Sequence, residues 1–117
     1  MENHLANQRQ AELDAMPRSA AISAKRYGIE TGGTTWNNWP VQTDRDSQGK
    51  INAAYVMARD GHWQGGWKFS DGVYRALTAD QVQAMALTVA AFVGACFAHE
   101  AALLADPVAD IGAGWPV

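Results

Sequence analysis

The sequence predicts an α+β domain in which β-hairpins and helices alternate along the chain. Two helix-start signals, at Thr43 and Thr78, each precede a run of apolar residues at helical spacing. Between them, the pair Asp71-Gly72 separates two segments that alternate in polarity, as the strands of a hairpin do. The predicted order is an N-terminal helical segment, a β-hairpin, an α-helix, a second β-hairpin and a long C-terminal α-helix packed on a small antiparallel sheet.

This order divides the chain into an N-terminal helical segment at residues 1–26, an α+β domain at residues 27–106 and a C-terminal tail at residues 107–117. The first segment is rich in helix formers, but Pro17 interrupts the pattern. We therefore expect a break there, and a second short helix that has Pro17 in its first turn and ends near Gly28. Such short helices need to pack on the domain or on another copy of the chain.

Residues that favour strands and turns follow this segment. A first hairpin is predicted with strands at Tyr27–Trp36 and Trp39–Gln42 and a turn at Asn37-Asn38, because asparagine is common in turns. Pro40 has no amide hydrogen, so the second strand is limited to an edge or to a short pairing.

The helix after this hairpin is predicted to begin at Thr43, with Asp46 in the position of a capping box. Negative charge in this first turn also complements the helix dipole. One apolar face follows at helical spacing, formed by Gln48, Ile51, Ala54, Tyr55 and Ala58. Gly61 is the predicted C-terminal stop.

The second hairpin is predicted to close through a two-residue turn at Asp71-Gly72, with positive φ at both positions. This turn sets four cross-strand pairs: Ser70 with Val73, Phe69 with Tyr74, Lys68 with Arg75 and Trp67 with Ala76. Since side chains alternate across a strand, the predicted core side comprises Trp67, Phe69, Tyr74 and Ala76. The two basic residues would then face solvent, opposite each other.

The last helix is predicted to begin with a capping box formed by Thr78 and Gln81 and to end at Asp106-Pro107. Apolar residues recur along it at helical spacing, and both of its phenylalanines are expected in the core. These apolar positions are Val82, Met85, Ala86, Val89, Phe92, Val93, Cys96, Phe97, Leu103 and Leu104.

Small residues, Ala91 and Ala95 among them, fill most other positions of this helix. Such a wide surface of apolar and small residues suggests that the helix is buried on more than one side. The tail that follows is rich in glycine and proline, and Ile111 and Trp115 are its candidate anchors.

Composition and charge exclude several classes of protein. The chain has 117 residues and a net charge of −3, with 48% hydrophobic and 18% charged residues, as in a single globular domain. Its lysines and arginines are scattered, whereas a nucleic-acid-binding domain carries a basic patch, so we expect no nucleic-acid partner. The sequence also lacks a secretion signal and an uninterrupted apolar run of about 18 residues, so we expect a soluble protein of a reducing cytoplasm with no membrane partner.

No constellation of residues predicts a catalytic, cofactor-binding or metal site, and we expect a protein that is not an enzyme. Residues 44–55 imitate the opening of a calcium loop, but Tyr55 stands where a bidentate glutamate is required. Cys96 and His99 lie three residues apart on one helix, but no second pair of ligands completes a tetrahedral site. We expect Cys96 to be an inert thiol in the core.

The five tryptophans are the one compositional excess. Four of them belong to the strand region, and the favoured interpretation is a hydrophobic layer between strands and helices. The alternative is an exposed platform for a sugar ring or a partner protein, for which Trp39 and Trp63 are the better candidates because turn residues flank them. The candidate interaction surface therefore comprises Trp36, Trp39 and Trp63, with Ala91 and Ala95 of the long helix.

The order of these parts resembles a family of domains of unknown function found in phage and prophage tail proteins, often towards the C-terminal end of tail-fibre-like polypeptides. The resemblance covers residues 28–104 and is carried by three motifs: Thr43 to Gln48 before an alanine-rich helix, Trp67-Lys68 before the Asp71-Gly72 turn, and Leu77-Thr78-Ala79 before a helix with Phe92 and Cys96-Phe97-Ala98. It implies a bacterial cytoplasm during assembly, with the virion tail as the alternative location. It brings no catalytic or ligand-binding residues.

Together these observations favour a non-enzymatic structural or assembly component of a phage or prophage tail that acts through protein–protein contacts. Its expected partners are phage tail or fibre proteins, and a homo-oligomer is the other association that the sequence allows. Two alternatives remain open: a carbohydrate-recognition module that uses the strand tryptophans, and a tail-fibre assembly chaperone.

Overall fold

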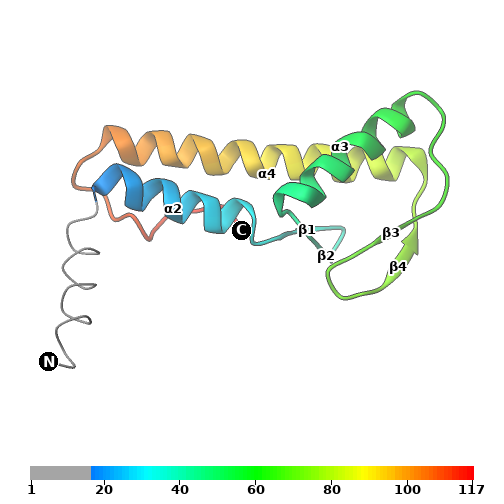
Figure 1. The fold of residues 1–117 in the computed structure, drawn as a ribbon, viewed down its shortest axis with the longest axis horizontal. Helices are drawn as coiled ribbons and strands as arrows, with labels where there is room; N and C mark the ends of the chain where they lie inside the picture. Colours follow the sequence, from blue (N-terminus) through cyan, green and yellow to red (C-terminus); the bar gives the residue numbers. More distant parts are fainter. Residues whose placement is uncertain (1–16) are drawn as a thin grey trace, which may run out of the picture.

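The computed structural model describes residues 17–117, so the helical pattern predicted before Pro17 lies outside the described part of the chain. With the labels of Figure 1, the described elements are the helices α2 (Arg18–Glu30), α3 (Arg45–Arg59) and α4 (Ala79–Ala105) and the strands β1 (Thr34–Trp36), β2 (Trp39–Val41), β3 (Gly66–Lys68) and β4 (Tyr74–Ala76). This is the predicted α+β class, with hairpins and helices in the predicted order.

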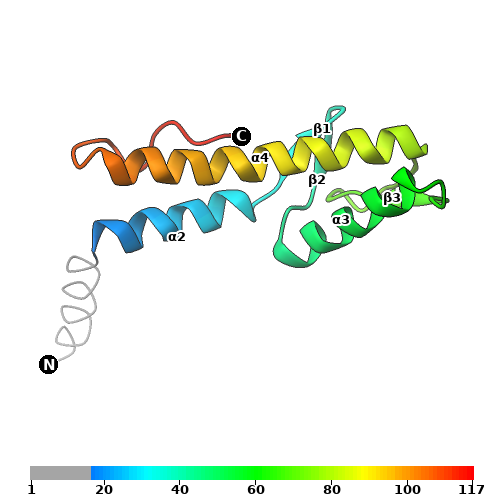
Figure 2. The ribbon, with the colours of Figure 1, turned by 90° about the horizontal axis from the view of Figure 1, so that it is seen from above.

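Helix α4 is the axis of the fold. It contacts both other described helices, α2 along its C-terminal half and α3 along its N-terminal half (Figures 1 and 2). The hairpins lie at the α3 end, and β1 contacts α4. Buried apolar residues of β2, α3, the second hairpin and α4 form the core at this end: Val41, Ile51, Ala54, Ala58, Phe69, Leu77, Val82, Met85, Ala86 and Val89.

The predicted ends of α4 are confirmed. The Gln81 amide donates to Thr78 Oγ1 at 3.2 Å, and the Thr78 amide donates to Gln81 Oε1 at 2.8 Å. This reciprocal pair satisfies two backbone donors that a helix start leaves without partners. The helix ends at Ala105, directly before Asp106.

The predicted cap of α3 is wrong by one residue. Asp44, not Thr43, is the N-cap, and its carboxylate accepts from the Ser47 amide at 3.2 Å. Thr43 is buried, and its hydroxyl accepts from the Gly33 amide at 2.8 Å. Thr43 thus links the segment before the first hairpin to the start of the helix. Asp44, which is also a favourable N-cap residue, begins the helix. The apolar face is confirmed, since Ile51, Ala54 and Ala58 are buried.

The first hairpin is shorter than predicted. Residues 27–30 form the last turn of α2 and not a strand. This helical turn places Glu30 in the interior, where it forms ion pairs with Arg26 and Arg45. The turn at Asn37-Asn38 is confirmed: both residues have positive φ, at 54° and 63°, and Trp36 pairs with Trp39 across a two-residue loop. Asparagine reaches this conformation more readily than most residues with a side chain.

The second hairpin has a different register from the predicted one. Lys68 pairs with Tyr74 and Trp67 with Arg75, one residue away from the expected pairs. The Gly72 amide donates to the Phe69 carbonyl at 2.9 Å and the Phe69 amide to the Val73 carbonyl at 3.0 Å, so the loop has three residues. A slip of one residue exchanges the faces of a strand, and Tyr74 is accordingly 72% exposed.

The hairpins form two separate two-stranded sheets where the sequence predicted one small sheet. The Ser70 amide donates to the Pro40 carbonyl at 2.9 Å and joins the two hairpins at this point. Since Pro40 carries no amide hydrogen, it cannot return the second bond of a continuing ladder. Phe69, which is buried, fills the space beneath both hairpins with Trp39.

The burial of α4 follows the predicted pattern with two exceptions, Phe97 and Leu104, of which Leu104 is 50% exposed. Phe92 is buried as expected, whereas Phe97 is 45% exposed and lies beneath the guanidinium of Arg26, 4.4 Å from its ring centroid. The tail lies against the helix through Trp115, one of its two candidate anchors, which packs edge to face on His99 with ring centroids 4.5 Å apart.

We expect Gly72→Val to lower the free energy of unfolding by about 1 kcal/mol or more. Gly72 has φ of +79°, a conformation that a β-branched residue strains to adopt, and no atom lies within 4 Å of its added Cβ, so backbone strain is the sole cause. Thermal and urea denaturation measure the effect. Ser70→Ala in the same loop is the control and should leave the midpoint unchanged, and an unchanged midpoint for Gly72→Val would contradict the described turn.

Candidate functional site

The tryptophans of the predicted interaction surface form a half-buried aromatic layer. Trp36 and Trp39 meet edge to face with ring centroids 5.7 Å apart, and Trp39 meets Phe69 in the same way at 5.3 Å. Trp63 packs beside Trp67 with centroids 6.4 Å apart, and its indole nitrogen donates to the Leu77 carbonyl at 3.0 Å. All four tryptophans pack against the core and none is fully exposed. Their main role is therefore in packing.

Arg75 covers this layer on the outside. Its guanidinium carbon lies 4.8 Å from the ring centroids of both Trp39 and Phe69, within the range of cation–π contacts. Asp71 holds the same guanidinium at 2.9 Å. The faces of these rings are thus occupied by a side chain of the same chain, which leaves less of Trp39 for a sugar ring.

Ala91 and Ala95 lie on a different surface, the exposed face of α4. From Leu87 onward, every exposed residue of this helix is alanine, glycine, leucine or phenylalanine: Leu87, Ala90, Ala91, Gly94, Ala95, Phe97, Ala98, Ala101, Ala102, Leu104 and Ala105. We call this set the α4 face. Monomeric soluble proteins rarely expose continuous apolar patches of this extent without a binding role.

Helix α4 also meets the requirements of length and composition for a membrane span. Its most apolar 18-residue stretch has a mean hydropathy of 1.7, and 22% of that stretch is buried. The core helix of a globular domain can meet the same requirements, but most of its surface is then buried. The sequence expectation of burial on more than one side is thus only partly met, because the described chain covers one side of α4.

A groove of about 540 Å³ borders the α4 face on the side of α3. From α3, Ile51 and Tyr55 line it; from α4, Leu87, Ala90 and Gly94 do. The groove is therefore mainly apolar and continuous with the α4 face.

Gly94 lies in the middle of this surface. A Cβ added to it would meet no atom within 4 Å, so the packing of the chain on itself does not require a glycine here. Glycine in a helix interior costs about 1 kcal/mol relative to alanine. The chain thus carries a destabilising residue for which its own fold shows no need.

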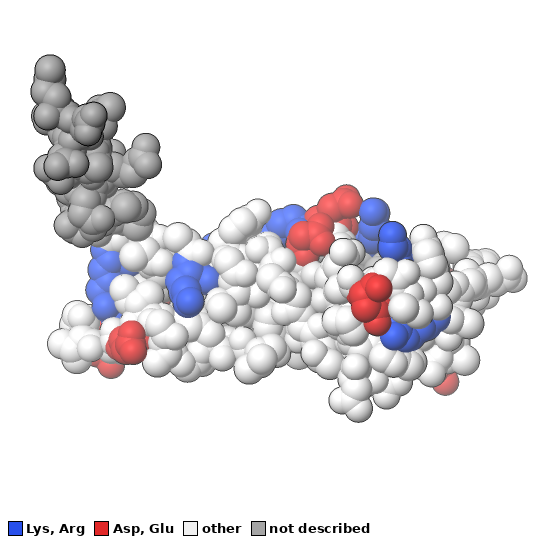
Figure 3. Space-filling model, turned by 90° about the horizontal axis from the view of Figure 1, so that it is seen from below, with Lys and Arg blue, Asp and Glu red and all other residues white. Residues whose placement is uncertain are grey.

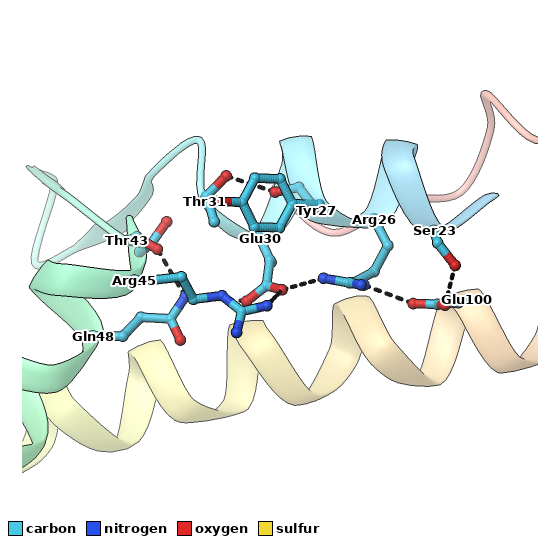
Figure 4. Close-up of polar contacts among 9 residues, drawn as sticks. All are labelled: Ser23, Arg26, Tyr27, Glu30, Thr31, Thr43, Arg45, Gln48 and Glu100. Carbon is cyan, nitrogen blue, oxygen red and sulfur yellow. Dashed lines mark hydrogen bonds and ion pairs between the residues drawn. The ribbon is translucent and has the colours of Figure 1, made fainter. Parts of the chain in front are cut away.

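A buried polar network joins α2, α3 and α4 on the opposite side (Figure 4). Glu30 is completely buried; Arg26 and Arg45 both donate to its Oε1, Arg45 at 2.5 Å, and Gln48 donates to its Oε2 at 3.1 Å. Arg26 also donates to Glu100 of α4 at 2.6 Å. Two carboxylates and two guanidinium groups balance in charge, as burial requires.

The hydrogen bonds of this network favour the charged forms of its two carboxyl groups. Burial acts to raise the pKa of the Glu30 carboxyl, but hydrogen bonds from Gln48, Arg45 and Arg26 outweigh it and hold the pKa below its ordinary value. The hydrogen bond from Arg26 likewise lowers the pKa of Glu100. Sequence reasoning missed this network because it ended the helix near Gly28. The spacing of Arg26 and Glu30, four residues apart, was the signal that could have indicated one more helical turn.

Cys96 faces the interior on the same side of α4. It is buried, and burial raises the pKa of its thiol, which agrees with the predicted inert core cysteine. His99 instead contacts the tail, where its Nε2 lies 2.7 Å from the Ala113 carbonyl. Within residues 17–117, no three His, Cys, Asp or Glu side chains gather as metal ligands would.

Charged residues are scattered on the face that Figure 3 shows. Blue and red areas are separate and small, and no extended area of one sign forms on this face. Several of these charges are paired with one another, for example Lys50 with Asp46 at 3.0 Å. This face lacks the continuous basic surface on which nucleic-acid binding depends.

Comparison with known proteins identifies a family. The model of a family described as Domain of unknown function (DUF4376) matches residues 9–113. No curated protein and no solved structure matches the chain.

Proposed function

This chain belongs to the DUF4376 family, and on that premise we propose that it is a non-enzymatic structural or assembly component of a phage or prophage tail. It acts through protein–protein contacts. The observation that supports this proposal is the α4 face, a long apolar surface with no polar side chain among its exposed residues. The tail setting rests on the motif resemblance at Thr43 to Gln48, Trp67-Lys68 and Leu77-Thr78-Ala79.

Two features of the structure favour a contact surface over a catalytic or sugar-binding site. The completely buried carboxylate, Glu30, is held by three donors that link helices, so its charge is used in the fold. The tryptophans are half-buried, and Arg75 lies over the ring of Trp39. A sugar platform needs an open ring face, whereas an assembly contact needs an apolar surface such as the α4 face.

The test of this proposal is recovery of the tagged full chain from its native lysate, with partners identified by mass spectrometry. We expect a tail or fibre protein to co-purify, and Ala91→Glu to reduce its recovery at least tenfold, because a buried unpaired charge opposes an apolar contact. Ala53→Glu is the matched control, since Ala53 is an exposed alanine on α3 outside the groove, and it should keep the partner.

A different result would support one of the alternatives. Saturable quenching of tryptophan fluorescence by a bacterial surface polysaccharide, lost in a folded Trp39→Ala or Trp63→Ala variant, would favour carbohydrate recognition. A complex with a fibre protein that dissociates before the particle is complete would favour an assembly chaperone. Recovery of no tail or fibre protein would contradict the proposal.

A further inference from the structure

We propose that the α4 face binds the same face of a second copy of this chain, so that two α4 helices pack antiparallel about a two-fold axis near Gly94. This inference rests on the proposed function and deepens it, because it names the occupant of the contact surface. Four features of the structure support it: the absence of charge, the row of small residues, the position of the groove and the area of the surface.

The charge of the α4 face suits a copy of itself. In a two-fold interface the same patch meets itself, so a charged residue close to the axis lies near its own like-charged copy. Residues 81–99 of α4 contain no Asp, Glu, Lys or Arg. The face is therefore free of like-charge repulsion against its copy and offers no charge that would select an oppositely charged partner.

Small residues allow the two helices to approach closely. Ala90, Gly94, Ala98 and Ala102 follow one another at four-residue spacing and are all exposed, so they form one row along α4. Rows of this kind let backbones pack against each other at short distance. A close approach from outside also accounts for Gly94, which has open space around its Cβ position and no role in packing within the chain.

The antiparallel arrangement places a side chain over the groove. With the axis at Gly94, residues seven and eight positions after it lie opposite residues seven and eight positions before it, so Ala101 and Ala102 of the second copy lie beside Leu87 and Ala86. Leu87 and Ala86 line the groove between α3 and α4. Leu104 is 50% exposed and Leu87 is 60% exposed in the single chain, and the dimer would bury both.

The area is sufficient for a modest interface. The stretch from Leu87 to Ala105 is about 28 Å long at 1.5 Å per residue, and with the neighbouring edge of α3 the surface is about 20 Å wide. The two copies would then bury about 1,100 Å² together, which is below the standard size and just above the lower bound of about 1,000 Å² for a specific interface. We therefore expect a reversible dimer with a micromolar dissociation constant.

A lipid bilayer fits this surface less well than a second copy. Helices α2 and α3 lie along α4 and carry charged side chains such as Lys25, Arg45 and Lys50. A bilayer that took in the length of α4 would also take in those charges, which is costly. The net charge of −3 also disfavours attraction to anionic lipids.

The experiment is sedimentation equilibrium of the full chain over a wide concentration range, with Gly94→Leu as the test variant. We expect the parent to dimerise and Gly94→Leu to weaken the dimer at least tenfold. Circular dichroism should show an intact fold, because the added side chain points into open space in the single chain. Gly49→Leu on α3 is the matched control: its Cβ position is equally open, it does not line the groove, and it should keep the dimer.

Crosslinking tests the geometry without relying on the stability of that variant. Under mild oxidation with oxidised glutathione, we expect Gly94→Cys to form a disulfide-linked dimer and Gly49→Cys to remain monomeric. A parent chain that is monomeric at all concentrations, or a folded Gly94→Leu chain that dimerises like the parent, would overturn the proposal. Flotation of the parent with phosphatidylcholine vesicles, lost in Ala91→Glu, would show that a lipid surface and not a second copy covers the α4 face.

These outcomes separate the inference from the proposed function. A monomer that still recovers a tail protein through Ala91 would contradict the dimer and keep the proposed assembly role. A dimer that recovers no tail or fibre protein would keep the dimer and contradict the proposed tail setting.

Discussion

Replacing Glu30 with alanine is expected to lower the free energy of unfolding by about 3 kcal/mol or more. The Glu30 side chain is completely buried, and its removal leaves Arg26, which is 14% exposed, without one of its two carboxylates. Arg45, whose side chain is 54% exposed, can turn to water, so we place the expected loss at the low end of the range for a broken buried pair. Urea denaturation followed by circular dichroism measures it.

Glu30→Gln is the control for this variant. Glutamine keeps the volume and one acceptor oxygen but lacks the charge, so we expect a loss smaller than that of alanine. If Glu30→Ala unfolds at the same urea concentration as the parent, the network does not hold α2 on the other helices, and the described packing of α2 is wrong.

The same residue makes stability depend on pH. Its folded pKa lies below the ordinary value of 4.5, so the stabilisation is fully present above that value and is lost as the pH falls through the folded pKa. We expect the parent to lose stability in acid more steeply than Glu30→Gln. Thermal unfolding of both proteins between neutral pH and about pH 3 measures the difference. Parallel curves would contradict a lowered pKa at Glu30.

The second large effect is expected at Phe92. Phe92→Ala should cost about 3 kcal/mol or more, because it removes a large apolar side chain from the interior and leaves a cavity. Phe92 is buried at 7% exposure on the side of α4 that faces the rest of the chain. In a domain of this size the loss is a large share of the total stability.

Phe97→Ala on the same helix is the matched control. Phe97 is 45% exposed, and its main described contact is with the Arg26 guanidinium. Its replacement should cost about 1 kcal/mol or less. Equal losses for the two variants, measured by urea denaturation at one protein concentration, would show that α4 is rotated relative to the described fold.

Short-range chemistry determined both ends of α4 and one of the turns from the sequence alone. The Thr78 capping box, the stop at Asp106 and the Asn37-Asn38 turn depend on residues within a few positions of each other, and each is present as predicted. The apolar spacing of α3 and of most of α4 likewise needed no knowledge of the fold. The small-residue character of α4, with Ala91 and Ala95, was also visible in the sequence.

The tertiary structure decided the features that depend on contacts between residues far apart in the sequence. Thr43 caps no helix because the Gly33 amide takes its hydroxyl. The Asp71-Gly72 pair suits both a two-residue and a three-residue loop. The structure has the three-residue loop, which places Phe69 in the core and Arg75 over Trp39. This loop fixes the register of the second hairpin.

Burial was also decided by partners far away in the chain. Glu30 could be buried only because α3 brings Arg45 and Gln48 to it, fifteen and eighteen residues along the chain. The exposure of Ala91, Ala95 and Gly94 depends on where α2 and α3 lie around α4. The periodicity of α4 alone does not predict these positions. The physical reason is that the apolar pattern of a helix determines which residues can be buried, whereas the packing of the other elements determines which of those residues are buried.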